Sequence, residues 1–343
     1  MKLLCRCRIW KIRYIPTYLP LKNPFPSGSP LRIRVPPTNP KFHSYQNHLT
    51  ISPPTMSPSD NDPEKKNPKI IHEVLAPLVS GSSSEKDITT AVRTVTDLAN
   101  EISTPKREKS VVDAYREDIV HDELSTLFWQ LYSEVFNLVG KTPAAQQAPL
   151  ISFLVQLQKE TIKPDFKFEE DASIWHDLPQ FGWAARDFFN FEVSNPSVGE
   201  KEKARWENIT YFLANLTMLS APGRKGIEAF DFSLYGLWAI REALEEGGEG
   251  EQEDTTEIAI KLAAVWFNVA GERLKALSEE GKVYTARTGV AGTKYEKTKP
   301  DWVGLNKERW GIWKEELKAR SEKSVRSGEV KGLVASALEL WEE

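Results

Sequence analysis

Apolar residues recur every three or four positions along most of the chain from Ser84 onward, and this spacing constrains the fold more than any other feature of the sequence. A clear example follows Ser84 and two acidic residues, a pattern typical of a helix N-terminus. Its apolar stripe consists of Ile88, Val92, Val95, Leu98 and Ile102. Such spacing puts the apolar side chains on one face of an α-helix, and that face must pack against another helix.

The same pattern returns in the rest of the chain. It predicts helices over about 84–102, 112–138, 143–157, 179–188, 206–216, 234–244, 258–281 and 306–323, and a last helix that ends at Leu340 and Trp341. Pro149 can divide the third of these in two. No long two-residue alternation and no Asn-Gly or Asp-Gly hairpin signal competes with this interpretation. We therefore predict an all-α fold, an irregular multi-helix bundle of roughly nine to eleven helices.

The N-terminal segment has a different composition. Residues 1–59 hold nine Lys or Arg, no Asp or Glu, and 11 of the 22 prolines. Proline at this density opposes both helices and sheets, so we expect a disordered leader over 1–68 and a single helical domain over 69–343. Within that domain, flexible loops are expected near 246–256, which is acidic, and 282–304, which is rich in Gly, Lys and Thr.

Three interpretations of the leader stay open. An Arg-rich, acid-free segment is typical of an organelle presequence, which would make the protein mitochondrial. Translation can instead begin at Met56, so that the upstream residues are absent from the protein. The third interpretation is a basic arm that binds nucleic acid.

Composition also excludes some classes of function for the rest of the chain. No run of about 18 apolar residues occurs, so we expect no membrane span. Both cysteines, Cys5 and Cys7, lie in the leader, which excludes disulfides and thiolate-bound metals from the helical part. After residue 59 there are 36 basic and 49 acidic residues, and this charge of −13 disfavours nucleic acid as a partner. We expect a cytoplasmic or nuclear protein unless the leader is a presequence.

Motifs for chemistry are mostly missing. The segment Gly289–Lys294 has glycines and a lysine, but neither the spacing nor the strand of a phosphate-binding loop. Past the leader, His72, His121 and His176 each lack a second histidine at metal-ligand spacing. There is no Gly-x-Ser-x-Gly elbow. We therefore name no catalytic residue, metal ligand or cofactor, and an enzyme is the less favoured interpretation.

Arginines and large aromatic residues lie repeatedly within one helical turn of each other. One interpretation is structural, with tryptophans filling gaps between helices and arginines pairing with carboxylates. The other is a concave pocket with aromatic walls in which arginines hold an anionic ligand or an acidic peptide. The candidate ligand-binding residues are Arg186, Trp238, Arg241, Arg309 and Trp310. This second interpretation predicts that Trp238, Arg241 and Arg309 meet at one cavity.

Four stretches of sequence are similar to a known family. They are Leu178–Asp187 (LPQFGWAARD), Trp206–Ala214 (WENITYFLA), Asp231–Glu245 (DFSLYGLWAIREALE) and Glu308–Lys314 (ERWGIWK). Together they resemble the fungal family catalogued as domain of unknown function 3632, over roughly residues 110–320. The resemblance implies a filamentous-fungal source and a helical domain. It implies no activity, cofactor or partner.

Two functions therefore remain as hypotheses. The first is a non-enzymatic helical protein that binds another protein, in keeping with amphipathic helices throughout the chain. The alternative is a protein that binds a small anionic metabolite, or an enzyme that acts on one, through the Arg/Trp pocket. Neither the ligand nor the oligomeric state follows from the sequence.

Overall fold

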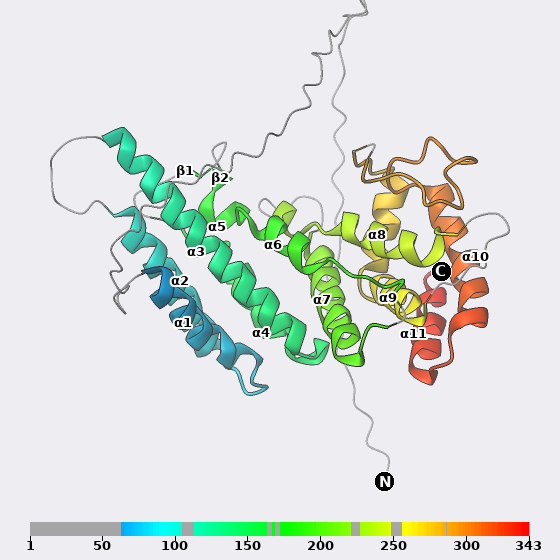
Figure 1. Ribbon diagram of the computed structural model, residues 1–343, viewed down its shortest axis with the longest axis horizontal. Coiled ribbons are helices and arrows are strands. Elements are labelled where there is room, and N and C mark those ends of the chain that lie inside the picture. Colours follow the sequence, from blue (N-terminus) through cyan, green and yellow to red (C-terminus); the bar gives the residue numbers. More distant parts are fainter. Residues whose placement is uncertain are drawn as a thin grey trace, which may run out of the picture. The chain divides into compact units, whose positions relative to one another are not determined.

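Helices make up nearly all of the regular structure, as the apolar periodicity predicts (Figure 1). The computed structural model describes residues 63–104, 113–162, 167–168, 172–195, 197–220, 227–247, 256–285 and 287–342. Its α-helices are α1 (Pro63–Leu75), α2 (Glu85–Ser103), α3 (Asp113–Lys141), α4 (Ala148–Leu157), α5 (Ile174–Asp177), α6 (Phe181–Phe188), α7 (Glu200–Leu219), α8 (Ser233–Leu244), α9 (Glu257–Glu280), α10 (Lys307–Ser324) and α11 (Gly328–Glu339). Short 3₁₀ turns are η1 (Ala76–Val79), η2 (Ala144–Gln146) and η3 (Ile227–Phe230).

The described part of the chain is thus an all-α bundle of eleven α-helices, within the predicted range. The predicted start of the helical domain at residue 69 falls inside α1. Most of the predicted leader lies outside the described residues. Of the loop predicted near 246–256, the structure describes only residues 246, 247 and 256. The segment expected to be irregular after α4 contains one very small antiparallel pair, β1 (Lys167–Phe168) and β2 (Ala172–Ser173), in which Lys167 pairs with Ser173.

Several helix ends follow from local chemistry. The Ser84 hydroxyl accepts a hydrogen bond from the Asp87 amide, and the Asp87 carboxylate accepts one from the Ser84 amide, which completes a capping box at the start of α2. Gly281 ends α9 with a left-handed φ of 71°, which glycine adopts without strain. Pro149 lies in the first turn of α4 and separates it from η2, as expected.

Gly140 does not end α3, which continues to Lys141. A Cβ atom at Gly140 would lie 3.1 Å from Cγ of Arg205 on α7. Glycine at this position therefore lets an arginine of the neighbouring helix lie close against α3.

The helices pack in two groups that share one core. In the first group α1, α2 and α6 contact α3, and α4 contacts α2. In the second group α8, α10 and α11 pack around α9. Helix α7 contacts both α3 and α9, and Figure 1 shows it between the two groups. Buried side chains of both groups form a single hydrophobic cluster.

None of the helices in the described ranges is long and apolar enough to cross a membrane.

Candidate functional site

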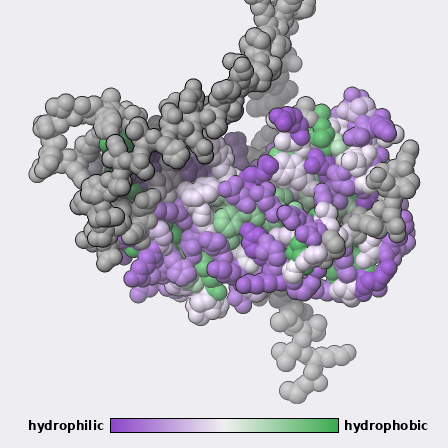
Figure 2. All heavy atoms as spheres, in the orientation of Figure 1, coloured by the Kyte–Doolittle hydropathy of each residue, from purple (hydrophilic) through white to green (hydrophobic). Residues whose placement is uncertain are grey.

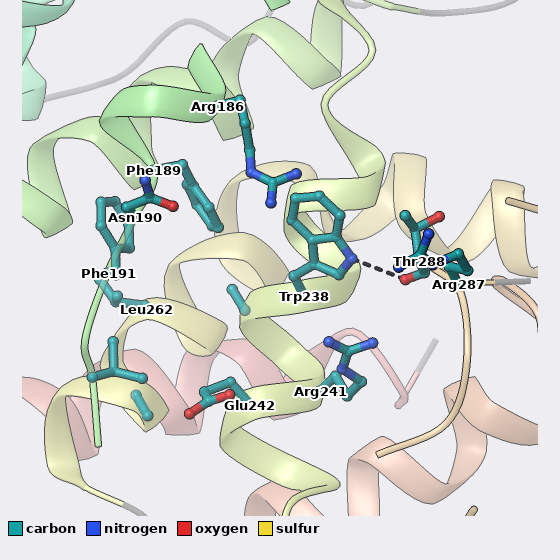
Figure 3. Close-up of a pocket in the computed structure, with 13 residues that line it drawn as sticks. Arg186, Phe189, Asn190, Phe191, Trp238, Arg241, Glu242, Leu262, Arg287 and Thr288 are labelled. Carbon is teal, nitrogen blue, oxygen red and sulfur yellow. Dashed lines mark hydrogen bonds between the residues drawn. The ribbon is translucent and has the colours of Figure 1, made fainter. Parts of the chain in front are cut away.

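A cavity of about 410 Å³ lies beside α8, between α6, α9 and the loop that follows α9 (Figure 3). We call it the α8 cavity. Its lining residues are Arg186, Phe189, Asn190, Phe191, Val193, Trp238, Ala239, Arg241, Glu242, Ala259, Leu262, Arg287 and Thr288. Three of the five candidate ligand-binding residues, Arg186, Trp238 and Arg241, are among them.

Helix α8 supplies the central face of this cavity. Trp238, Arg241 and Glu242 stand at positions i, i+3 and i+4, so Arg241 and Glu242 lie one helical turn after Trp238 and each neighbours it. The amphipathic pattern that buries Leu237 and Ile240 in the core therefore leaves these three at the edge of the core. Figure 3 shows Arg241 and Glu242 pointing to different sides of α8 below the indole ring.

The indole ring of Trp238 is held from two sides. Its Nε1 donates a hydrogen bond of 2.9 Å to the Thr288 carbonyl oxygen. The guanidinium of Arg186, which comes from α6, lies 4.9 Å from the centre of the ring, at cation–π distance (Figure 3). These contacts fix one wall of the cavity, and Phe189 and Phe191 belong to the segment that lines it after α6.

The three arginines of the cavity differ in their partners. Arg186 and Arg287 are exposed, and neither has a carboxylate within ion-pair distance among the described residues. Arg241 lies 3.6 Å from Glu246, measured from Nε to the carboxylate oxygen, and its Nε is buried without a hydrogen bond. Positive charge at the cavity is therefore only partly neutralised by the described part of the chain.

Among the described residues, Glu242 is the one acidic residue in the lining, and its side chain is exposed. Partial burial nevertheless raises the pKa of its carboxyl group, and the nearby charge of Glu246 raises it further, while Arg241 acts in the opposite direction. The described residues give Glu242 no hydrogen bond and no ion pair.

Arg309 and Trp310 do not line the α8 cavity. Both side chains of the Arg309–Glu245 pair are fully buried, and two parallel hydrogen bonds of 2.7 Å and 2.8 Å join them. The other three N–H groups of Arg309 donate to the carbonyl oxygens of Gly289, Val290 and Gly304. All five donors of the guanidinium are used, so Arg309 has none left for a ligand.

Trp310 belongs to an aromatic cluster of the core. Its ring stacks on Trp341 at 4.8 Å between ring centres and meets Phe267 edge-on at 5.7 Å. Its side chain does not line the α8 cavity. For Arg309 and Trp310 the structural interpretation of the Arg/Trp pattern therefore describes the fold, and Trp238, Arg241 and Arg309 do not meet at one cavity.

The loop over 282–304, which carries Arg287 and Thr288, is bound to the helices at several points. Carboxylate oxygens of Glu245 accept the Trp313 indole N–H at 2.6 Å and the Gly292 amide at 2.9 Å, in addition to Arg309. A Cβ atom at Gly292 would lie 2.5 Å from the Glu245 carbonyl oxygen. The glycine that suggests mobility in the sequence is thus the residue that permits this close contact.

The start of the same loop is tied to the start of α8. Lys282 pairs with the Asp231 carboxylate, and the Ser233 hydroxyl contacts both Asp231 at 2.5 Å and the Tyr284 hydroxyl at 2.6 Å. Burial by itself raises the pKa of Asp231, but hydrogen bonds from Lys282 and Ser233 outweigh it and hold the pKa below its ordinary value.

Replacing Asp231 by asparagine is expected to make the free energy of unfolding less dependent on pH in the acidic range. The folded-state pKa is lowered, so the ionised carboxylate stabilises the fold above about pH 4, and this contribution is lost as the pH falls through the folded pKa. Asp231→Asn should destabilise the full chain by about 1–2 kcal/mol at pH 7 and by progressively less below about pH 4.

Urea midpoints at pH 7, 4 and 3 measure this effect. Asp301→Asn removes an exposed carboxylate of the same loop for which the described residues show no ion pair, and should change no midpoint. An Asp231→Asn deficit that stays constant down to pH 3 would contradict the expected role of this carboxylate.

Sequence reasoning missed much of the cavity. Phe189 and Phe191 follow the end of α6, and they could have been noticed as the cluster Phe188–Phe191. Arg287 is a lone arginine in a loop, and no local pattern marks it. Glu242 directly follows Arg241 in the sequence, but the carboxylate that lies near Arg241 is that of Glu246.

Fold and site define this chain as an all-α helical bundle with a cavity lined by arginines and aromatic residues. The model of the family described as Protein of unknown function (DUF3632) matches residues 132–317, more than half of the 343 residues, and the chain belongs to this family. All the residues that line the α8 cavity lie within the matched range. No curated protein and no solved structure matches the chain.

Proposed function

We propose that this protein binds a small anionic molecule in the α8 cavity. The observation that carries the proposal is the meeting of three arginines from separate segments, Arg186, Arg241 and Arg287, at one cavity with aromatic walls. Two of them have no carboxylate partner in the described part of the chain. Guanidinium groups suit carboxylates and phosphates, because their N–H groups match the geometry of these anions.

The cavity also offers an apolar surface for the body of a ligand. Phe189, Phe191, Val193 and Leu262 contribute to its lining together with the indole of Trp238. A volume of about 410 Å³ is within the range of small-molecule sites, which combine apolar walls with a few polar groups. The ligand that fits this lining is an acid with an apolar portion.

The chemistry of the lining supports binding more than catalysis. In the part of the chain that the structure describes, the lining includes no histidine, cysteine, serine or lysine, and Glu242 is the one side chain there that could act as a general base. Within the described residues no group of three or more His, Cys, Asp or Glu is arranged to hold a metal ion.

Binding of another protein is the second hypothesis from the sequence, and one side chain favours it. Trp183 on α6 is 69% exposed. However, Figure 2 shows polar residues over most of the described surface in view, with small apolar areas among them. Single exposed apolar residues are common on monomeric proteins, so the cavity supports the first proposal better than Trp183 supports the second.

A panel of carboxylates and phosphate monoesters, tested by thermal melting of the full chain, is expected to contain stabilising ligands. A ligand at 100 times its Kd adds about 2.7 kcal/mol, which corresponds to several degrees in Tm. For such a ligand, Arg186→Gln and Arg287→Gln should each weaken binding about tenfold, the lower end for a hydrogen bond to a charged group.

Arg93→Gln is the matched control, because Arg93 is an exposed arginine of α2 outside the cavity. Its affinity for the same ligand should equal that of the unaltered protein. A cooperatively melting protein that none of these anions stabilises would contradict the proposal and give first place to a protein partner. Equal affinity in all three arginine variants would place the anion outside the cavity.

A further inference from the structure

The α8 cavity carries charges of both signs, and they stand apart. Arg186 lies over the indole of Trp238 on the side of α6, and Glu242 follows Trp238 by one helical turn, about 6 Å along α8. Figure 3 shows Arg186 and Glu242 on opposite sides of the Trp238 side chain. The cavity also has an apolar lining that includes Phe189, Phe191 and Leu262.

Glu242 is not accounted for by an internal partner. Arg241, its neighbour in the chain, points to a different side of α8 and lies near Glu246. Within the described residues nothing else pairs with the Glu242 carboxylate, although its surroundings raise its pKa. Its side chain is exposed at the cavity, so a cationic group or hydrogen-bond donor of a ligand can reach the carboxylate.

This arrangement discriminates among classes of ligand. A simple anion gains from the arginines but meets repulsion from Glu242, and a simple amine gains from Glu242 but is repelled by three arginines. A molecule with an acid at one end and an amine at the other satisfies both. Unfavourable contacts of this kind exclude competing ligands and so set specificity.

We infer that the ligand of the α8 cavity is amphoteric, with an acidic group held at Arg186, an apolar and preferably aromatic body against Trp238, Phe189 and Phe191, and an amine held by Glu242. The inference rests on the proposed function, because it assigns the second charged group of the same anionic ligand. Glu242 is then a specificity-determining residue that selects amine-bearing acids over plain acids.

Three probes of similar size test the inference: 4-(aminomethyl)benzoate, 4-ethylbenzoate and 4-isopropylbenzylamine, each with homologues longer by one methylene. Calorimetric titration of the full chain should give at least tenfold tighter binding for the amphoteric probe than for the plain acid. The plain amine should bind most weakly. A tenfold ratio corresponds to about 1.4 kcal/mol, the lower end for a hydrogen bond between charged groups.

Glu242→Gln should remove this preference. It is expected to weaken binding of the amphoteric probe about tenfold and to leave the plain acid unchanged or bound more tightly, since the repulsive charge is gone. Glu279→Gln is the matched control, an exposed glutamate of α9 that stands 17 positions, or roughly 25 Å of helix, beyond Leu262. It should alter neither affinity.

The outcomes separate the inference from the proposed function. If the two acids bind equally well, or Glu242→Gln changes both by the same factor, the amphoteric ligand is refuted while anion binding stands. If the protein is stabilised only by acids that carry no amine, the inference is again refuted and the proposed function survives. If no acid of any kind binds, the proposed function is overturned, and this inference with it.

Discussion

Replacing Glu245 by alanine is expected to lower the free energy of unfolding by about 3–5 kcal/mol, because it leaves the Arg309 guanidinium buried without a counter-charge. The loss also frees the Trp313 indole N–H and the Gly292 amide, both of which donate to the Glu245 carboxylate. Arg309→Met should cost a similar amount, since it strands the carboxylate and three carbonyl oxygens.

Urea unfolding of the full chain measures these changes. A double variant distinguishes the cost of a stranded buried charge from the cost of lost side-chain packing. Glu245→Leu combined with Arg309→Met leaves no buried charge, so its loss should be clearly smaller than the sum for the two single variants. Additive losses would contradict a coupled pair. Glu246→Ala, next in the chain and partly exposed, is the control and should cost about 1 kcal/mol or less.

The Arg309–Glu245 pair also positions the loop over 282–304, which forms one wall of the α8 cavity. Arg309 binds the carbonyl oxygens of Gly289 and Val290, which directly follow Arg287 and Thr288 in the loop. The Val290 carbonyl oxygen also lies 3.5 Å from Nη1 of Arg241. Arg309 therefore has a place in the proposed site as a support for its wall, although sequence reasoning gave it the role of a ligand contact.

The helical architecture could be predicted because it depends on local signals. Periodic apolar residues, the Ser84 capping box and the glycine after α9 each act within a few residues of chain, and each appears where expected. The joint placement of Trp238 and Arg241 follows from the same short-range geometry. No local signal explains Gly140, because the side chain that needs the space, Arg205, lies on another helix.

The composition of the cavity could not be predicted because its parts are distant in the chain. Arg287 is about 50 residues from Trp238, and only the packing of the loop on α8 brings them together. Arg309 has the same local pattern as an arginine that binds a ligand, and its partner Glu245 is 64 residues away. A sequence shows which arginines lie near tryptophans, but it does not show which arginines already have a buried carboxylate.

Glycine in the loop over 282–304 illustrates a second limit. Composition associates glycine with flexibility, yet Cβ atoms at Gly289 and Gly304 would lie 2.2 Å and 2.1 Å from backbone oxygens of other loop residues. Two isolated bridges, Val283 with Gly304 and Val290 with Val303, run along this contact. Here glycine permits close backbone packing, and sequence alone does not distinguish that use from mobility.

Phe181 at the start of α6 is expected to be among the most sensitive positions of the core. The chain enters this helix through two residues with left-handed backbone, Leu178 (φ 47°) and Gln180 (φ 67°), on either side of Pro179. Such conformations are unfavourable for residues other than glycine, so the surrounding packing must hold them. Their effect is to direct the Phe181 ring into the core, where it is 1% exposed.

The ring of Phe181 joins aromatic residues from both sides of the bundle. It contacts Tyr132 (5.1 Å between ring centres), Phe136 (5.5 Å), Phe232 (5.7 Å) and Phe230 (6.4 Å). The first two belong to α3, and the last two to the segment that leads into α8. Removing this ring therefore loosens the contact between the first helix group and the helix that carries Trp238, Arg241 and Glu242.

Phe181→Ala is expected to lower the free energy of unfolding by about 3–5 kcal/mol, the usual loss for a fully buried phenylalanine whose neighbours cannot close the cavity. Urea unfolding of the full chain measures it. Trp183→Ala is the matched control, because Trp183 is a large aromatic of the same helix that is mostly exposed, and its loss should stay within about 0.5 kcal/mol. Similar losses in the two variants would contradict this prediction. They would mean that the buried ring of Phe181 contributes no more to stability than the exposed ring of Trp183.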